Sequence, residues 1–287
     1  MASDSRLFVA LTVDVDPDAN RAVEGRPDAV SPEGEATFNA TLEGLRDLRG
    51  VLQDRVLPAT FFWEGRTLHE LAVRDARLID SLRRNRALEH GCHGYQHEDF
   101  AGRESGRALS LEQIRGALQK AEAAVQEHLG DRPTAFRAPY CRLTDELVQV
   151  LDERNYTYDA SLTRRAGADW SLRPRRLRDG PVWELALCQA SDRDGRAISG
   201  YLWQLLEGNR PVDDYVRMVG ELVGPCGGGL LQIALHPWHL RVKADGCPAD
   251  EANADMVAGL LDEIGAIDGV CLTTNAGYLA RFERSKV

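Results

Sequence analysis

The sequence contains little lysine and no long apolar run. Only three of its 35 basic residues are lysines, and 45 acidic residues leave a formal net charge of −10. A chain of this charge has no general attraction to nucleic acid or to an anionic membrane surface, so we expect neither as a partner. No apolar stretch approaches the roughly 20 residues that a membrane helix needs, so we expect no membrane insertion.

Closely paired cysteines and a secretion signal are also missing. The six cysteines are widely spaced and form no Cys-x-x-Cys pair. The polar segment 1–6 leads directly into a short apolar stretch that ends in acids, unlike a signal peptide. We therefore expect a cytoplasmic protein whose cysteines are mostly free and buried.

The remaining sequence alternates short apolar runs with longer segments of helical period, which predicts an α/β protein with a mainly parallel sheet. The expected strands are 7–13, 59–63, 135–137, 156–160, 182–187, 230–235 and 270–273, with a weaker one at 87–90. The expected helices are 37–53, 69–85, 111–129, 144–153, 212–222 and 253–264. Seven or eight such units would close into a barrel, and we expect residues 1–287 to form one domain.

Three local features refine this prediction. Ser110 and Gln113 form a capping-box pattern at the start of helix 111–129. The segments 17–35 and 164–180 are expected to be irregular, and neither is expected to be a linker because the alternation resumes on both sides. In a barrel of this type, the working face gathers the carboxyl ends of the strands.

Two carboxylates end the first expected strand. Asp14 and Asp16 are two residues apart, so their side chains project from the same side of that strand. Such a pair suits a metal ligand beside a general base. Acids also cap the start of polar loops, so the pair alone leaves both interpretations open.

Two histidines lie four residues apart beyond the weak strand. His93 and His97 would face the same way on a helical turn, where two imidazoles can bind one cation. Solvated surface histidines are the alternative for this pattern alone. His90 precedes the glycine that opens the loop, and we leave it out of the pair.

Two further segments follow expected strands. In Arg137-Ala-Pro139-Tyr140 the proline removes one backbone donor, which leaves a defined amide at the next residue and an arginine at the strand end. The strand 230–235 delivers His236 at its carboxyl end, and a proline then turns the chain, so we expect His239 at the rim. A surface turn and a structural histidine are the ordinary alternatives.

Taken in order, these segments resemble the polysaccharide deacetylase family, also called the NodB-homology or family 4 carbohydrate esterase fold. Thr12-Val-Asp14-Val-Asp16 resembles the first family motif, usually Thr-Phe-Asp-Asp-Gly, in a spaced form similar to the branch of peptidoglycan-deacetylase-like and allantoinase-like proteins. The other similar segments are Ala59-Thr-Phe-Phe62, Arg137-Ala-Pro-Tyr140, Tyr158-Asp-Ala-Ser161 and His236-Pro237. The resemblance extends from about residue 7 to 282 and implies a distorted (β/α)7–8 barrel.

The resemblance implies a metal-dependent hydrolase. It would remove an N-acyl group, such as acetyl, from an amino sugar or glycan precursor, so its partner would be a small-molecule or glycan substrate. Asp16, His93 and His97 would hold one divalent metal. The expected metal is zinc, and Co2+ or Ni2+ could substitute for it.

The resemblance also implies roles around that metal. Asp14 would be the general base for an attacking water, and Arg137 would keep it ionised and oriented. The metal and the backbone N–H of Tyr140 would stabilise the oxyanion. His236 would protonate the departing amine.

The spaced Asp-x-Asp departs from the family pattern because it moves the metal aspartate by one residue. A second departure and two alternatives also stay open. The Asp-Trp pair that flanks the acid histidine in many members has no equivalent after Asp159, where Leu162 stands, and Asp169-Trp170 is not assigned. The partner of His236 is therefore unidentified. Hydrolysis of another small amide, as in the allantoinase-like branch, and a non-catalytic carbohydrate-binding barrel remain alternatives, although six intact chemistry-bearing residues favour an enzyme. An oligomer is compatible with the sequence.

Overall fold

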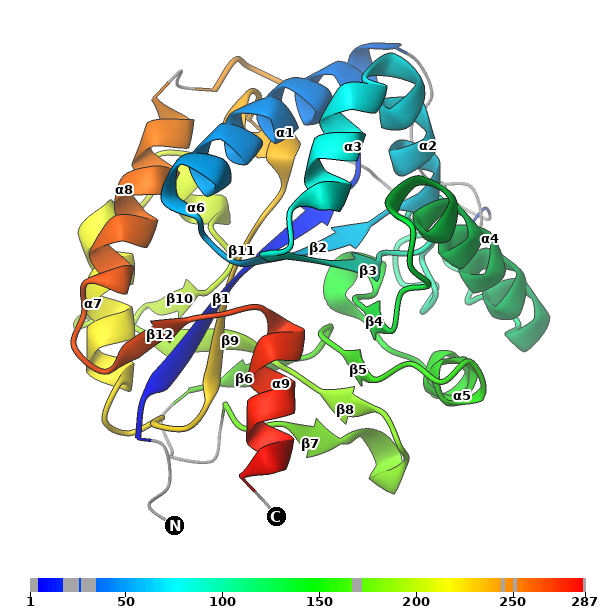
Figure 1. Ribbon diagram of the computed structural model, residues 1–287. Coiled ribbons are helices and arrows are strands. Elements are labelled where there is room, and N and C mark those ends of the chain that lie inside the picture. The colour runs from blue at the N-terminus through cyan, green and yellow to red at the C-terminus, as the bar shows by residue number, and fades with distance from the viewer. Residues whose placement is uncertain are drawn as a thin grey trace.

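A curled, mainly parallel sheet forms the centre of the computed structural model, which describes residues 5–17, 26, 35–166, 172–243, 246–249 and 252–285 (Figure 1). Along the sheet the strands are β11 (Leu230–Leu235), β1 (Leu7–Val15), β2 (Ala59–Trp63), β3 (Leu88–Cys92), β4 (Ala135–Phe136), β5 (Tyr158–Asp159), β8 (Trp183–Glu184) and β7 (Arg175–Arg176). Only the pairing of β7 with β8 is antiparallel on this path. The expected α/β barrel architecture is confirmed in this half-barrel form.

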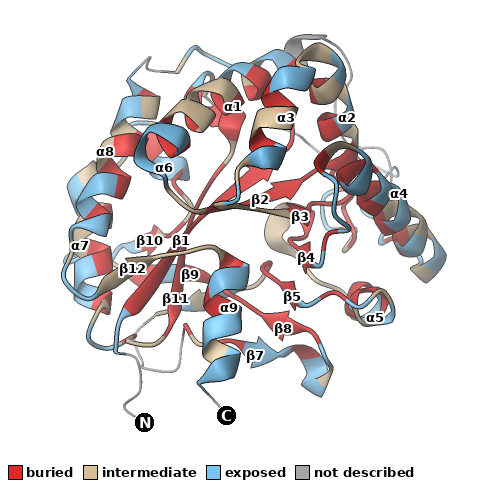
Figure 2. Ribbon diagram, viewed as in Figure 1, coloured by how far each residue is buried: buried red, intermediate tan, exposed pale blue. Residues whose placement is uncertain are grey.

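The strand β1 lies at the middle of the molecule, and all nine of its residues are buried (Figure 2). One edge pairs with β11, while β12 (Val270–Leu272) and β2 share the other edge, at residues 7–9 and 11–15 respectively. A strand with neighbours on both edges and cover on both faces needs apolar side chains throughout, which its sequence LFVALTVDV supplies up to the two acids.

Helices cover the outside of the sheet and turn their buried faces inward (Figure 2). They are α1 (Glu35–Arg55), α2 (Gly65–Arg74), α3 (Ala76–Arg84), α4 (Leu111–Leu129), α5 (Asp145–Glu153), α6 (Trp203–Leu206), α7 (Val212–Leu222), α8 (Asn253–Gly265) and α9 (Asn275–Arg284). The capping box of Ser110 and Gln113 is present at the start of α4, as its sequence predicts. No described helix has the length and apolarity required to cross a bilayer.

Several local expectations were wrong. The expected helix 69–85 is two helices, because the Asp75 side chain accepts a hydrogen bond from Leu78 N and starts α3 afresh. The expected strand 182–187 divides between β8 and the start of β9 (Leu187–Ser191). That strand lies in a second sheet with β6 (Thr163–Arg165) and β10 (Ala197–Ser199), which the sequence pattern did not indicate, and α9 was also not expected.

The two segments expected to be irregular are only partly described. Within 17–35 the structure describes residues 17, 26 and 35, so that expectation lies mostly outside the described residues. Within 164–180 it describes short strands at β6 and β7, while 167–171, including the unassigned Asp169-Trp170, fall outside. Cys92, Cys188 and Cys226 are buried, as expected, whereas Cys247 is exposed.

Candidate functional site

Chemistry-bearing residues follow three of the four consecutive strands β11, β1, β2 and β3 at one rim of the sheet. Asp14 and Asp16 lie at the end of β1, His93 follows β3, and His236 follows β11. Because the carboxyl ends of parallel strands meet at the same edge, these side chains converge. A cavity of about 260 Å³ opens there, lined by Asp14, Asp16, Pro17, His93, His97, Tyr140, Cys141, Tyr201, Trp203, His236 and Trp238.

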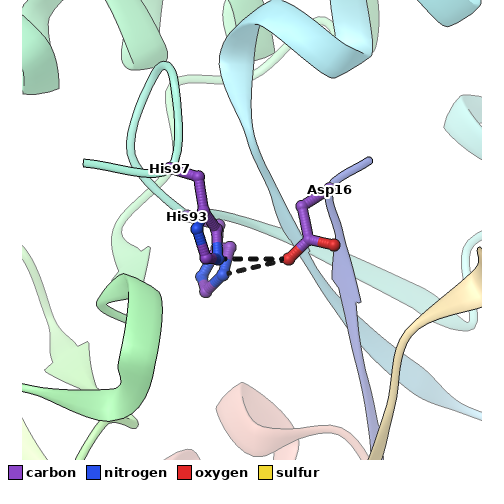
Figure 3. Close-up of side chains that lie close together, drawn as sticks. All are labelled: Asp16, His93 and His97. Carbon is purple, nitrogen blue, oxygen red and sulfur yellow. Dashed lines mark ion pairs between the residues drawn. The ribbon is translucent and has the colours of Figure 1, made fainter. Parts of the chain in front are cut away.

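A cluster of one carboxylate and two imidazoles lines this cavity (Figure 3). Asp16 Oδ2 lies 3.6 Å from His93 Nε2 and 3.4 Å from His97 Nε2. The potential ligand atoms of the three buried residues all lie within 4.8 Å of one another. An N₂O donor set with this spacing suits zinc or another borderline-soft divalent cation.

The outer atoms of the cluster are held by neighbouring groups. His93 Nδ1 lies 2.9 Å from the carbonyl oxygen of Arg137, so the proton belongs on Nδ1 and the lone pair of Nε2 faces Asp16. Trp238 Nε1 donates to Asp16 Oδ1 at 3.1 Å, which leaves Oδ2 facing the histidines. These contacts orient both side chains as a metal site requires, so the residues present fit the metal that the sequence implies.

The expectation that a helical turn aligns the two histidines was wrong. The segment 93–97 is a loop, in which Gly94 and His97 both have positive φ angles, of 76° and 58°. The Glu98 carboxylate accepts hydrogen bonds from Tyr95 N and Gln96 N at 2.9 and 3.0 Å and closes this loop. A Cβ atom at position 94 would lie 2.5 Å from Glu98 Oε2, which explains the glycine there.

Asp14 is held by a cation and a phenol. Its Oδ1 accepts from Arg137 Nη1 at 2.8 Å, and its Oδ2 accepts from the Tyr201 hydroxyl at 2.7 Å. Burial alone would raise the pKa of Asp14, but Arg137 and the nearby histidines and Tyr201 outweigh it and hold that pKa below its ordinary value. Asp14 is therefore an oriented carboxylate at neutral pH.

The Arg137 side chain is buried, and each of its three guanidinium nitrogens has an acceptor. Besides Asp14, its Nη1 contacts Thr12 Oγ1, its Nη2 donates to Gln232 Oε1 at 2.7 Å, and its Nε donates to Ala160 O at 2.9 Å. A buried guanidinium satisfied in this way is fixed in orientation, so it holds Asp14 in one position.

His236 has a partner that the sequence did not identify. The Tyr201 hydroxyl lies 2.9 Å from its Nε2 and so joins it to Asp14. His236 Nε2 also lies 3.5 Å from Asp16 Oδ2, and burial lowers the pKa of His236. The only sign of Tyr201 in the sequence is an aromatic residue after a glycine, a signal too weak to find it.

The structure places the remaining candidates as follows. His239 does not lie at the rim as expected: it is buried, and its Nε2 lies 2.5 Å from Glu207 Oε1. The Tyr140 ring packs edge-on against His97 with centroids 4.7 Å apart, and its backbone φ is 58°. His90 stays out of the cavity lining and accepts from Trp63 Nε1 at 3.1 Å.

Comparisons with known proteins find similar sequences and similar folds. Residues 35–158 match the family described as Polysaccharide deacetylase. A peptidoglycan deacetylase of Helicobacter pylori is 25% identical over 177 residues, which cover 58% of this chain and 55% of that protein. The peptidoglycan deacetylase-like protein FGM2 of Gibberella zeae is 28% identical over 104 residues, which cover 36% of this chain and 28% of that protein. This chain thus spans about half or less of the curated relatives that it matches.

Solved structures share the fold. One comes from Mycobacterium smegmatis, where the assignment as a polysaccharide deacetylase is provisional; it has a TM-score of 0.70 and 21% identity, with 100% of this chain and 94% of that chain covered. A family 4 carbohydrate esterase pseudoenzyme from Bacillus anthracis has a TM-score of 0.54 and 15% identity, with 96% and 66% covered. At these identities the likeness shows the fold alone.

Proposed function

Because residues 35–158 match the polysaccharide deacetylase family, we propose that the chain is a metal-dependent hydrolase that removes an N-acyl group, such as acetyl, from an amino sugar or glycan. The observation that carries the proposal is the convergence of Asp14, the Asp16–His93–His97 cluster and His236 on one cavity. A barrel that only bound carbohydrate would have no use for a buried arginine that orients a carboxylate beside that cluster.

Asp16, His93 and His97 would hold the metal, which we propose to be zinc. When bound, such an ion lowers the pKa of a coordinated water toward neutrality and polarises a carbonyl oxygen. Asp14, kept ionised by Arg137, would take the proton of the attacking water. A carboxylate held at 2.8 Å by a fixed guanidinium is oriented for that transfer before substrate arrives.

The other steps would use Tyr140 and His236, which also line the cavity. The backbone N–H of Tyr140, at the turn after β4, would donate to the developing oxyanion. His236 would protonate the departing amine, which is a poor leaving group without a proton. Tyr201 would orient His236 and Asp14 together, because its hydroxyl contacts both.

The cavity volume bears on the substrate. About 260 Å³ lies slightly below the range of roughly 300–1,000 Å³ for drug-sized ligand pockets. This volume suits one sugar ring with its acyl group, and it equally suits a small cyclic or ureido amide. The substrate panel therefore includes N-acetylated mono- and oligosaccharides beside allantoin.

The test measures metal content and hydrolysis in matched variants. Asp14→Asn should keep the metal and lose about 10²–10⁴-fold in rate, the usual contribution of a general base. Asp16→Asn should weaken the metal itself. Asp80→Asn, a surface acid paired with Arg83 and Arg84, is the control and should change neither.

Three outcomes would overturn parts of the proposal. Full metal occupancy in the His93→Ala/His97→Ala double variant would refute the metal site. Equal metal loss in both aspartate variants would mean that the carboxylates are joint ligands. Wild-type protein that binds metal but hydrolyses no amide of the panel would refute the reaction.

A further inference from the structure

A second pair of carboxyl groups lies behind the site without contacting the cavity. Asp159 on β5 and Glu184 on β8 are direct partners in the register of two parallel strands, so both side chains leave the sheet on the same side. Both residues are fully buried. Within the described part of the chain, neither carboxyl group forms an ion pair with a lysine or arginine.

The hydrogen bonds of the two carboxyl groups are unequal. Asp159 accepts from Ser161 Oγ on Oδ1 at 2.7 Å and from Ser161 N on Oδ2 at 2.8 Å. Glu184 accepts from Leu162 N on Oε1 at 3.0 Å, and its buried Oε2 accepts from no described donor. An ionised carboxylate needs donors on both oxygens, whereas a protonated one needs an acceptor for its hydroxyl.

Two adjacent carboxylates cannot both stay ionised in a dry interior. Burial raises the pKa of both groups, and the pKa of Glu184 lies well above its ordinary value because Asp159 is also close. The donors around Asp159 favour its charge, while Glu184 Oε2 has no donor. The shared proton therefore belongs on Glu184.

The Asp159 side of the pair connects to the candidate site through Ser161. The Ser161 hydroxyl donates to Asp159 and in turn accepts from Ala138 N at 2.8 Å. The carbonyl of Ala138 accepts from Cys141 N at 3.0 Å, so both backbone groups of Ala138 are engaged. Pro139 has no N–H, so Ala138 N is the last backbone donor before Tyr140.

The turn beyond Ala138 needs such an anchor. Tyr140 and Cys141 both have positive φ angles, of 58° and 53°. Bulky non-glycine residues in this region are strained and persist only where the surroundings impose the conformation.

We propose that Glu184 carries the shared proton and donates it to the Asp159 carboxylate, and that this pair, acting through Ser161 and Ala138, is a positioning device for the Tyr140 turn. The positioning role rests on the proposed function, because that function assigns the Tyr140 N–H as the oxyanion donor. The part that concerns the proton does not depend on any activity.

The experiment compares two isosteric changes that each remove one carboxyl group. In Glu184→Gln the amide replaces the acid as a donor to Asp159, so the melting temperature and kcat should stay close to wild type. In Asp159→Asn one oxygen becomes an NH₂ group that faces a donor. The melting temperature should then fall by about 5 °C and kcat by about 10-fold, with KM and metal content unchanged.

Two further variants separate positioning from general stability. Glu184→Met keeps the length of the side chain but donates nothing, so it should behave like Asp159→Asn, and glutamine at the same position is its rescue. Ser161→Ala keeps both carboxyl groups but removes the hydroxyl that donates to Asp159 Oδ1 and accepts from Ala138 N, so it should lower kcat about 10-fold at unchanged KM and metal content.

The outcomes are distinct. If Glu184→Gln lowers the melting temperature and kcat while Asp159→Asn matches the wild type, the proton lies on Asp159 instead. Equal changes in the two variants would refute an asymmetric pair. Wild-type kcat in Ser161→Ala would refute the positioning role. If the wild-type protein hydrolyses no amide, the melting temperatures still test the proton assignment, so failure of the proposed function is recognised separately.

Discussion

Replacing Tyr201 by phenylalanine removes one hydroxyl group from between Asp14 and His236 and leaves the ring in place. The hydroxyl donates to Asp14 Oδ2 at 2.7 Å and lies 2.9 Å from His236 Nε2. A hydrogen bond to a charged group contributes about 1.5–3 kcal/mol, so its loss should lower kcat/KM about 10- to 100-fold. Metal content should not change, because Tyr201 contacts none of the three metal-binding candidates through this hydroxyl.

The pH dependence of kcat/KM should also change when the Tyr201 hydroxyl is removed, and the direction of the change can be predicted. The Tyr201 hydrogen bond favours the ionised form of Asp14, so it contributes to holding the pKa of that carboxyl below its ordinary value. Without it the pKa rises, and a general base must be ionised to act, so the acid limb of kcat/KM should move to higher pH. Stability linked to Asp14 is fully present above its unfolded pKa and is lost as pH falls from there through the folded pKa, so in the variant the loss should be smaller and should be complete at a higher pH.

The matched control is Tyr278→Phe, which removes a buried hydroxyl that donates to the Gly228 carbonyl at 2.9 Å, away from the cavity. It should leave kcat/KM and the acid limb unchanged. The assay is release of acetate from an N-acetylated substrate between pH 4 and 9. A Tyr201→Phe variant with wild-type kcat/KM and an unmoved acid limb would refute the view that this hydroxyl orients the base and the acid.

The remaining predictions use other contacts. Trp238→Phe, which removes the donor to Asp16 Oδ1, should weaken zinc binding about 10- to 100-fold in a chelator competition, and unchanged affinity would contradict this. His236→Ala should keep the metal and lose more activity on amides than on aryl esters, while His239→Ala should lower thermal stability instead; the reverse pattern would move the acid to His239. Burial lowers the pKa of His90 to about 4, so its contribution to stability, on the order of 3 kcal/mol, should be lost as pH falls from 6.5 to 4. Urea unfolding should show less of this loss in His90→Gln, and equal curves would exclude the contribution.

The strands that carry the site could be predicted because their sequences are constrained. A buried strand between two neighbours must be apolar along its length, so the acids at the end of β1 stand out. The strand β11 is also apolar apart from Gln232, and its six residues are all buried before His236. The break between α2 and α3 could not be predicted, since Asp75 differs from other surface acids only by the cap that it forms after folding.

The loop conformations of the site could also not be predicted from the sequence. The spacing of His93 and His97 indicated a shared ligand, and the two rings do lie together, with centroids 5.2 Å apart. The reason is different from the expected one: a loop closed by Glu98 brings them together, with no helical turn. A four-residue spacing constrains which side chains can meet but not the backbone that joins them.

The contacts that make the site chemically competent are long-range, and this determines what a local pattern can reveal. Arg137 lies 123 residues from Asp14 in the chain, and Tyr201 lies 187 residues from it, yet both contact its carboxylate. Arg137 belongs to a recognisable segment at a strand end, whereas Tyr201 follows the edge strand β10 and reaches the site through a single bridge to Ala234. A residue that lies outside the regular strands and helices has no periodic neighbours to mark it. The side chain that joins the candidate base to the candidate acid is therefore one that only the folded chain identifies.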